Sequence, residues 1–282
     1  MKTAISLDSA CDLSEEIIKA NDFKIIPFGV SMGDRFFYDG EVSTLEIFEY
    51  ADSHKTLPKT NAVNEEAFTE HFKKLLEEYD AVIHFDISSE MSSAYDNAVK
   101  AAKKFENVFV IDSRTLSTGI ALEALYAKKL TDEGFSPEET VVKVKKRIPY
   151  VQASFVIERL DYLYKGGRCS GLALFGANLL KIRPEIEVKN GKMGSTAKYR
   201  GRMQDVVTKY CRDTLEKYNT PDKKVVFITH SMATPEMVEA AKDVLAPFGF
   251  ENIYETTAGC TVSSHCGKNT LGILYINDGG AE

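Results

Sequence analysis

The chain has 282 residues, 44% hydrophobic and 27% charged, so it is long enough for two compact domains with cores of their own. Its 35 basic and 42 acidic residues give a net charge of -7, and no long run of Lys and Arg is present, which excludes the usual basic surface of a nucleic-acid-binding protein. We therefore expect no nucleic acid among its partners.

The first residues, Met1 to Asp8, lack the apolar core of a signal peptide, and no apolar stretch further along is long enough to span a membrane. The five cysteines form no Cys-x-x-Cys pair, which argues against a disulfide framework and favours free thiols. These features predict a cytoplasmic protein.

The first half of the chain alternates short apolar runs with helical patterns. This alternation predicts parallel strands joined by crossover helices. The predicted strands cover Thr3–Leu7, Phe23–Pro27, Ala81–Ile87 and Val108–Asp112, and the predicted helices cover Leu13–Ala20, Thr44–His54, Asn64–Glu78, about Ser92–Phe105 and about Thr118–Glu133. A further helix is expected after Ser136, a good N-cap residue, with Pro137 in its first position.

The pattern changes near Val151, where we place a domain boundary that gives domains 1–150 and 151–282. In the second domain an alternating strand precedes Asn190-Gly191, a dipeptide typical of a β-hairpin turn and hence of some antiparallel pairing. The elements expected there are strands at 153–157, 182–188, 224–230, 252–256 and 271–276, and helices at 159–164, 203–218 and 235–245. The sequence thus predicts two α/β domains: an N-terminal one with a mostly parallel sheet and helices on both faces, and a C-terminal one with a mixed sheet and helices.

Four polar clusters suggest a site built from loops at strand ends. Three begin at Asp8, Ile87 and Lys165, and the fourth places His265 in a polar turn of small residues ahead of an apolar strand. Open α/β sheets bind ligands at the carboxyl ends of their strands, where the first two clusters fall.

Common catalytic signatures are absent from this sequence. It contains no G-x-S-x-G, G-x-G-x-x-G or H-E-x-x-H motif, and Gly267-Lys-Asn-Thr lacks the upstream glycine of a P-loop. The five histidines stand in unrelated segments, so we expect neither a metal site nor a bound cofactor.

Seven segments together resemble the DegV family, in the family's order and approximate spacing along nearly the whole chain. They are Leu7-Asp-Ser-Ala-Cys-Asp-Leu, Lys59-Thr-Asn, Ile87-Ser-Ser-Glu-Met-Ser-Ser-Ala-Tyr, Ile111-Asp-Ser, Leu163-Tyr-Lys-Gly-Gly-Arg-Cys-Ser, Lys198-Tyr-Arg-Gly and Ser264-His-Cys-Gly-Lys-Asn-Thr-Leu-Gly. The resemblance implies a bacterial lipid-binding protein with two α/β domains that holds a long-chain fatty acid in a buried tunnel, its carboxylate near the domain junction.

The resemblance also implies a partner and a role. Such proteins present the bound fatty acid to a fatty acid kinase, which makes an acyl phosphate for phospholipid metabolism. The protein itself would then be a non-catalytic binding subunit, and peripheral contact with a membrane is compatible with ligand exchange.

The head-group site follows from the same resemblance. Thr60 aligns with the threonine that opens the family's Thr-Ser-Gln-Pro segment, and Asn61 replaces the usual serine there. Ser92 aligns with the serine of the family's Ser-Gly-Thr segment, and Ser89 lies in the same loop. His265 matches the histidine of the family's His-Thr-Gly-Pro-Gly segment, here changed to His-Cys-Gly-Lys-Asn.

Arg200, after the Asn190-Gly191 hairpin, matches an arginine that the family pattern links to carboxylate contact or kinase engagement. The apolar stripes Leu122, Leu125 and Tyr126, and Leu172, Leu174 and Phe175, would normally be core, but some of them are expected to line the acyl tunnel.

Each assignment has a structural alternative. Serine is a common helix-cap and turn residue, which would explain Ser88, Ser89 and Ser92 without a ligand. Aspartate commonly caps loops, which would explain Asp8 and Asp112. Gly166-Gly167-Arg168 fits a helix stop better than a ligand contact. His265 on its own fits a buried core histidine, and His230 is a second candidate for a functional histidine.

A second class of function is a serine hydrolase acting on an acyl ester, with Ser92 as nucleophile and His265 as base. The sequence offers no evident acidic residue to orient His265 and no nucleophile elbow around Ser92, so the carrier is favoured.

Overall fold

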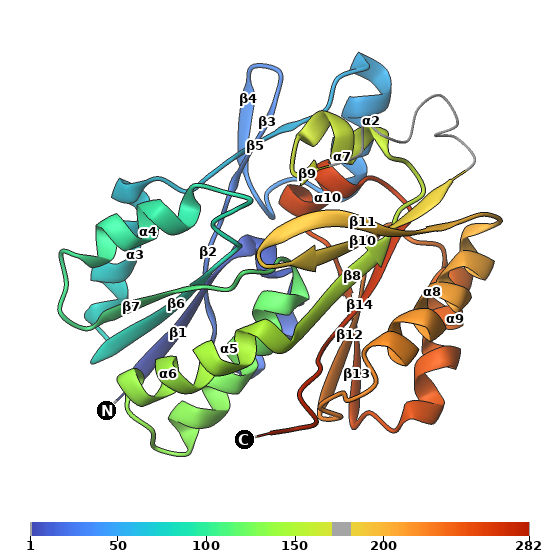
Figure 1. Ribbon diagram of the computed structural model, residues 1–282. Coiled ribbons are helices and arrows are strands. Elements are labelled where there is room, and N and C mark those ends of the chain that lie inside the picture. Colours follow the sequence, from blue (N-terminus) through green and yellow to red (C-terminus); the bar gives the residue numbers. More distant parts are fainter. Residues whose placement is uncertain (1, 171–181, 282) are drawn as a thin grey trace.

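The computed structural model describes residues 2–170 and 182–281 and contains three sheets (Figure 1). The first sheet has the order β2-β1-β6-β7, and every neighbouring pair in it is parallel. Its strands are β1 (Thr3–Asp8), β2 (Lys24–Ile26), β6 (Ala81–Asp86) and β7 (Val108–Asp112). This parallel sheet confirms the prediction from the alternation of strands and helices.

Two pairs of helices cover the first sheet on its two faces (Figure 1). The pairs are α3 (Glu65–Leu76) with α4 (Ala94–Ala102), and α5 (Thr118–Asp132) with α6 (Pro137–Arg147). The predicted N-cap of α6 is confirmed, since the Ser136 side chain accepts a hydrogen bond from Glu139 N within a capping box and Pro137 follows it. The short α1 (Glu15–Ala20) begins two residues later than the sequence pattern suggested.

The second sheet is mixed, with the order β13-β12-β14-β8-β10-β11-β9. Its strands are β8 (Val151–Val156), β9 (Cys169–Ser170), β10 (Arg183–Lys189), β11 (Lys192–Tyr199), β12 (Val225–Ser231), β13 (Asn252–Thr257) and β14 (Thr270–Ile276). The predicted hairpin is confirmed: β10 and β11 pair antiparallel, and Asn190 and Gly191 both have positive φ, as a type I′ turn requires. Helices α8 (Met203–Lys217) and α9 (Pro235–Leu245) pack on this sheet.

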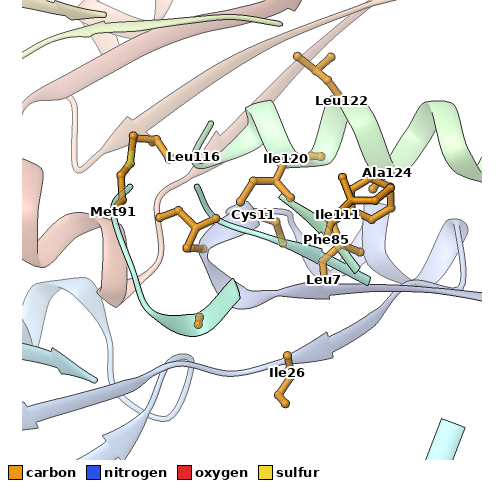
Figure 2. Close-up of a cluster of buried hydrophobic side chains, with 14 of the residues drawn as sticks. Leu7, Cys11, Ile26, Phe85, Met91, Ile111, Leu116, Ile120, Leu122 and Ala124 are labelled. Atoms are coloured by element: carbon orange, nitrogen blue, oxygen red, sulfur yellow. The ribbon is translucent and has the colours of Figure 1, made fainter. Parts of the chain in front are cut away.

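Helix α5 joins the two domains, because it contacts β1 and β6 of the first sheet and β8, β12 and β14 of the second. Figure 2 shows part of the resulting core, where Leu7, Phe85 and Ile111 from the strands meet Ile120 and Ala124 of α5. Met91 and Leu116 lie beside each other at one end of the same cluster. One continuous core therefore crosses from one domain to the other, while the boundary near residue 150 stays a prediction.

The third sheet is small and was not predicted. Strands β3 (Gly29–Met32), β4 (Arg35–Tyr38) and β5 (Lys59–Asn61) pair antiparallel in the order β4-β3-β5. Helices α2 (Thr44–His54), α7 (Asp161–Gly166) and α10 (Cys260–Cys266) gather near it, because α10 contacts α2, α7, β3 and β5 (Figure 1). Short 3₁₀ turns complete the described elements: η1 (Ser9–Cys11), η2 (Ile148–Tyr150) and η4 (Ala246–Phe248).

The prediction of a polar turn around His265 is wrong. The structure shows helix α10 there, with His265 in its last turn, and β14 begins four residues after the helix ends. The helix brings a segment from the C-terminal domain against the third sheet.

Candidate functional site

A cavity of about 250 Å³ lies between the two domains. Its walls come from β5, the loop between β6 and α4, the start of α5, strands β8, β10, β11, β12 and β14, and helices α7 and α10. Large apolar side chains form much of this wall, namely Phe28, Met91, Leu116, Phe155, Val188 and Leu274. Such a lining favours the hydrocarbon part of a ligand.

Two predicted site residues meet at this cavity. Thr60 Oγ1 and His265 Nε2 lie 2.9 Å apart, within hydrogen-bonding distance, although 205 residues separate them in the chain. Strand β5 carries Thr60, which pairs with Val30 of β3. Helix α10 carries His265. The geometry therefore places these two residues in one site.

Burial and a neighbouring positive charge keep His265 neutral. Loss of hydration and, to a smaller degree, the charge of Arg168 lower the pKa of His265 to about 4. Among the described residues, Nδ1 of His265 has no hydrogen-bond partner. Because Nδ1 is buried, a carboxyl group in the cavity has to reach the neutral ring from its Nε2 side, beside the Thr60 hydroxyl.

Ser92 lines the same cavity, and Ser93 next to it is exposed. The Ser92 hydroxyl accepts a hydrogen bond from the backbone N–H of Ala94 at 3.2 Å. Helix α4 begins at Ala94, two residues later than predicted. The structural alternative for Ser92 is thus present as a turn contact, since the N-cap residue of α4 is Ser93, and the Ser92 hydroxyl proton stays available to a ligand.

Arg168 also lines the cavity, although the sequence pattern favoured a structural role for its segment. Gly167 ends α7 with φ of 69°, which confirms the helix stop. Arg168 follows directly and donates from Nη1 to the carbonyl oxygen of Gly166 at 2.7 Å. The charge of its exposed guanidinium reaches His265. One sequence signal could have identified Arg168: it is a cationic residue directly after the helix-ending Gly167, within one of the seven segments that resemble the DegV family.

Three predicted site residues lie outside the cavity wall. Asn61 is exposed and donates to Ser31 Oγ at 3.0 Å. Ser89 donates to Asp112 from both its backbone N–H and its hydroxyl. Arg200 is exposed in the loop between β11 and α8, and we find no hydrogen bond or ion pair for it within residues 2–170 and 182–281.

The strand-end aspartates cap loops, as their structural alternative predicted. Asp8 accepts hydrogen bonds from Ala10 N and Ile87 N, and Asp112 accepts from Ser89 N and Arg114 N. His230 lines the cavity, but its ring nitrogens already lie near Glu255 Oε1 and Ala233 N.

The predicted tunnel residues divide into two groups. Leu122, Leu125 and Tyr126 border a different and smaller cavity of about 110 Å³ beside β12 and β14. Leu172, Leu174 and Phe175 lie outside the described residues.

Nothing in the described residues assembles a catalytic triad or a metal centre. Neither Ser92 nor any carboxylate there is hydrogen-bonded to His265, whose one partner is Thr60. No group of three or more His, Cys, Asp or Glu side chains in that part of the chain could hold a metal ion. No helix among the described residues is both long enough and apolar enough to cross a membrane.

The fold and the cavity define a class of protein: two α/β domains that enclose an apolar interdomain cavity, with a threonine, a serine, a histidine and an arginine on one part of its wall. Residues 2–278 match the family described as "Uncharacterised protein, DegV family", so the chain belongs to the DegV family. This confirms the resemblance of the seven segments.

Relatives support the same placement. A DegV domain-containing protein of Clostridium acetobutylicum is 31% identical over 98% of this chain and 98% of its own length. A fatty acid-binding protein of Thermotoga maritima is 29% identical over 96% of both chains. The solved structure of a stearic acid-binding protein from Eubacterium ventriosum is 25% identical, covers 98% of both chains, and has a TM-score of 0.85.

Proposed function

We propose that this protein is a non-catalytic carrier that holds a long-chain fatty acid in the interdomain cavity and presents its carboxylate to a fatty acid kinase. The observation that carries the proposal is the Thr60–His265 contact on the wall of an otherwise largely apolar cavity. The fatty acid-binding and stearic acid-binding relatives support the choice of ligand.

The acyl tail supplies most of the affinity. Each buried methylene contributes about 0.8 kcal/mol, so a tail of ~14 methylenes contributes up to ~10 kcal/mol. One charge-assisted hydrogen bond adds roughly 1.5 to 3 kcal/mol. The hydroxyls of Thr60 and Ser92 and the ring of His265 therefore fix the orientation of the ligand more than its total binding energy.

The charge on Arg168 makes the head-group end selective for an anion. Because this guanidinium lies close enough to lower the pKa of His265, it also stabilises a carboxylate bound beside that ring. Arg168 is exposed and Ser93 next to Ser92 is exposed, so a partner protein can approach the carboxylate from solvent. This is the access that a kinase needs.

Mass spectrometry of protein purified without added lipid tests the carrier. We expect free fatty acid to copurify, and Thr60→Ala and Ser92→Ala each to retain less of it than the parent. Thr208→Ala is a matched control, since the Thr208 hydroxyl on α8 donates to Gln204 O in its own helix. Equal retention by the two site variants and the control would remove these anchor assignments.

The hydrolase alternative and the kinase role have their own tests. An acyl-serine adduct, or turnover of a chromogenic ester that Ser92→Ala abolishes, would replace the carrier by an enzyme. For the partner, Arg200→Ala is expected to impair acyl-phosphate formation by a fatty acid kinase while leaving lipid retention unchanged. Normal acyl-phosphate formation by this variant would remove the role of Arg200.

A further inference from the structure

Helix α10, which carries His265, is held at its N-terminus by two carboxylates from the other domain. Its N-cap is Gly259, which has no side chain to cap the helix. Instead Gly259 N donates to Asp12 Oδ1 at 2.7 Å, and Asp39 accepts from Cys260 N at 2.8 Å and Thr261 N at 3.3 Å. A carboxyl oxygen at a helix N-terminus satisfies free N–H groups, and this holds for Asp12 although burial raises its pKa well above the ordinary value.

Each carboxylate is fixed in turn by a serine hydroxyl. Ser9 donates to Asp39 Oδ2 at 3.0 Å, and Ser117 donates to Asp12 Oδ2. Ser117 precedes α5 with φ of 55° and ψ of -144°, a backbone region that residues other than glycine rarely adopt. Ser117 is 4% exposed and lines the interdomain cavity. Asp12 therefore connects the start of α5 to the start of α10.

The two carboxylates fit because Gly259 is a glycine. A β-carbon on Gly259 would lie 3.1 Å and 3.2 Å from the carboxylate oxygens of Asp39, and 3.5 Å from Asp12 Oδ1. The same turn is anchored once more by Cys260, whose thiol donates to the carbonyl oxygen of Val42 at 2.9 Å. The position of the helix start thus depends on residues more than 200 positions earlier in the chain.

A short helix transmits this constraint to the site. His265 is five residues after Cys260, which is roughly 7 to 8 Å along the helix axis. If the first turn shifts or tilts, the imidazole moves with it, and its contact with Thr60 Oγ1 is lost. Substrate-binding groups that act through a hydrogen bond tolerate little displacement.

We propose that Asp12 and Asp39 are positioning residues, which hold α10 so that His265 faces Thr60 and the ligand carboxylate. The inference rests on the proposed function, since it concerns the same head-group site. It predicts a defect specific to the carboxylate and visible at His265 in the ligand-free protein.

The experiment compares Asp39→Ala and Asp12→Ala with Asp39→Asn and Asp12→Asn. The control is Asp34→Ala. Asp34 is exposed in the turn of the β3–β4 hairpin, and Asp39 follows the end of that hairpin directly. For each protein we would record the imidazole signals and titration of His265 by NMR without ligand, the melting temperature, and the binding of radiolabelled palmitate and of hexadecanol. Hexadecanol has the same tail and no carboxylate.

The expected result has three parts. The alanine variants shift the His265 signals and bind palmitate at least tenfold more weakly, with hexadecanol binding changed less than twofold. The asparagine variants, which keep an oxygen acceptor for a helix amide, recover part of the palmitate affinity. The control behaves like the parent in every measurement.

Other outcomes would overturn the inference. Unchanged His265 signals in folded Asp39→Ala and Asp12→Ala would show that the carboxylates do not position the ring. An equal loss of affinity for palmitate and for hexadecanol would show that Asp12 and Asp39 stabilise the cavity as a whole and do not act on the carboxylate site alone. If an alanine variant fails to fold, the asparagine variant decides by the same criteria. A failure of the proposed function would give a different result, because His265→Ala would then bind palmitate like the parent. The NMR comparison without ligand would still test whether Asp12 and Asp39 position His265.

Discussion

Gly166, the last residue of α7, lies directly against the imidazole of His265 on α10. A β-carbon added to Gly166 would be 2.5 Å from Nδ1 of His265 and 3.4 Å from its Cε1. Gly166 has an ordinary helical backbone, so the glycine is needed here for space and not for a positive φ. Nδ1 is also buried and has no hydrogen-bond partner among the described residues, so α7 covers this side of the ring while Thr60 contacts Nε2 on the other side.

Gly166→Ala is expected to displace His265 and weaken fatty-acid binding. Alanine is the better helix former, so α7 itself gains on the order of 1 kcal/mol in local propensity. The added methyl group nevertheless forces the ring away from Thr60 and the ligand carboxylate, and the loss of one hydrogen bond to that charged group, roughly 1.5 to 3 kcal/mol, corresponds to an about 10- to 150-fold weaker Kd for palmitate. Equilibrium binding of labelled palmitate measures this change.

Gly194→Ala provides the control for this experiment. Gly194 lies in β11, has no positive φ, and has no neighbouring atom within 4 Å of the point that a β-carbon would occupy. We expect Gly194→Ala to bind palmitate like the parent. A Gly166→Ala protein that does the same would show that the ring is free to move without cost.

The titration of His265 is expected to change when ligand binds. In the free protein, burial and the charge of Arg168 hold its pKa at about 4, so the ring is neutral at pH 7. A carboxylate hydrogen-bonded to the ring favours the protonated form, so the pKa of His265 in the complex rises toward its ordinary value of about 6.5. Binding therefore takes up a proton between the two pKa values, and affinity for the carboxylate increases as the pH falls through that range. NMR titration with and without palmitate checks this, and identical curves would place the carboxylate elsewhere.

Much of the fold could be predicted because it follows local rules. The apolar runs that form β1, β6 and β7 and the Asn190-Gly191 turn each carry their own signal within a few residues. The third sheet carries no such signal, because β3 to β5 are three or four residues long and β4 is largely exposed. Thr60 was found through the family pattern and not through recognition of its strand.

Helix α10 could not be predicted from its own residues. Its sequence, Cys-Thr-Val-Ser-Ser-His-Cys, contains no strong helix former, and β-branched residues and serines favour other conformations. Asp12 and Asp39 stabilise the helix by accepting hydrogen bonds from the backbone amides of Gly259 and Cys260. These amides lie 247 and 221 residues further along the chain. Long-range caps of this kind leave no trace in a local window of sequence.

Glu123 is expected to destabilise the protein at neutral pH. It lies on α5, is 1% exposed, and its two carboxylate oxygens lack partners among the described residues. Burial, with a smaller effect of Asp112, raises the pKa of Glu123 well above 4.5. The folded state then binds a proton that the unfolded state has released, so the stabilising contribution is complete below pH 4.5 and is lost as the pH rises through the folded pKa.

Replacement by methionine tests this sign. Glu123→Met should raise the free energy of unfolding at pH 8 by about 1 to 3 kcal/mol, since an unpaired buried polar group is removed, and the gain should shrink toward pH 4. Urea unfolding at several pH values measures it, with the exposed Glu78→Met as control. A gain that does not vary with pH would mean that Glu123 does not titrate in this way.

Chain-length preference is expected to depend on Ala153 and Val188, neighbours on β8 and β10 that border two cavities at once. The cavity beside His265 offers about 250 Å³, and the second, beyond Ala153 and Val188, about 530 Å³. We expect the tail of a long acid to extend from the first cavity into the second between these two residues, which line both.

Ala153→Phe should narrow this passage and Val188→Ala should widen it. We expect Ala153→Phe to bind palmitate at least tenfold more weakly, because several methylenes, each contributing about 0.8 kcal/mol, lose their place, while decanoate binds as before because its tail ends short of the passage. Val188→Ala should shift the copurified lipids toward longer chains. Direct binding of both acids and mass spectrometry of copurified lipid measure these changes. Equal weakening of palmitate and decanoate by Ala153→Phe would indicate that the tail takes another path through the domain interface.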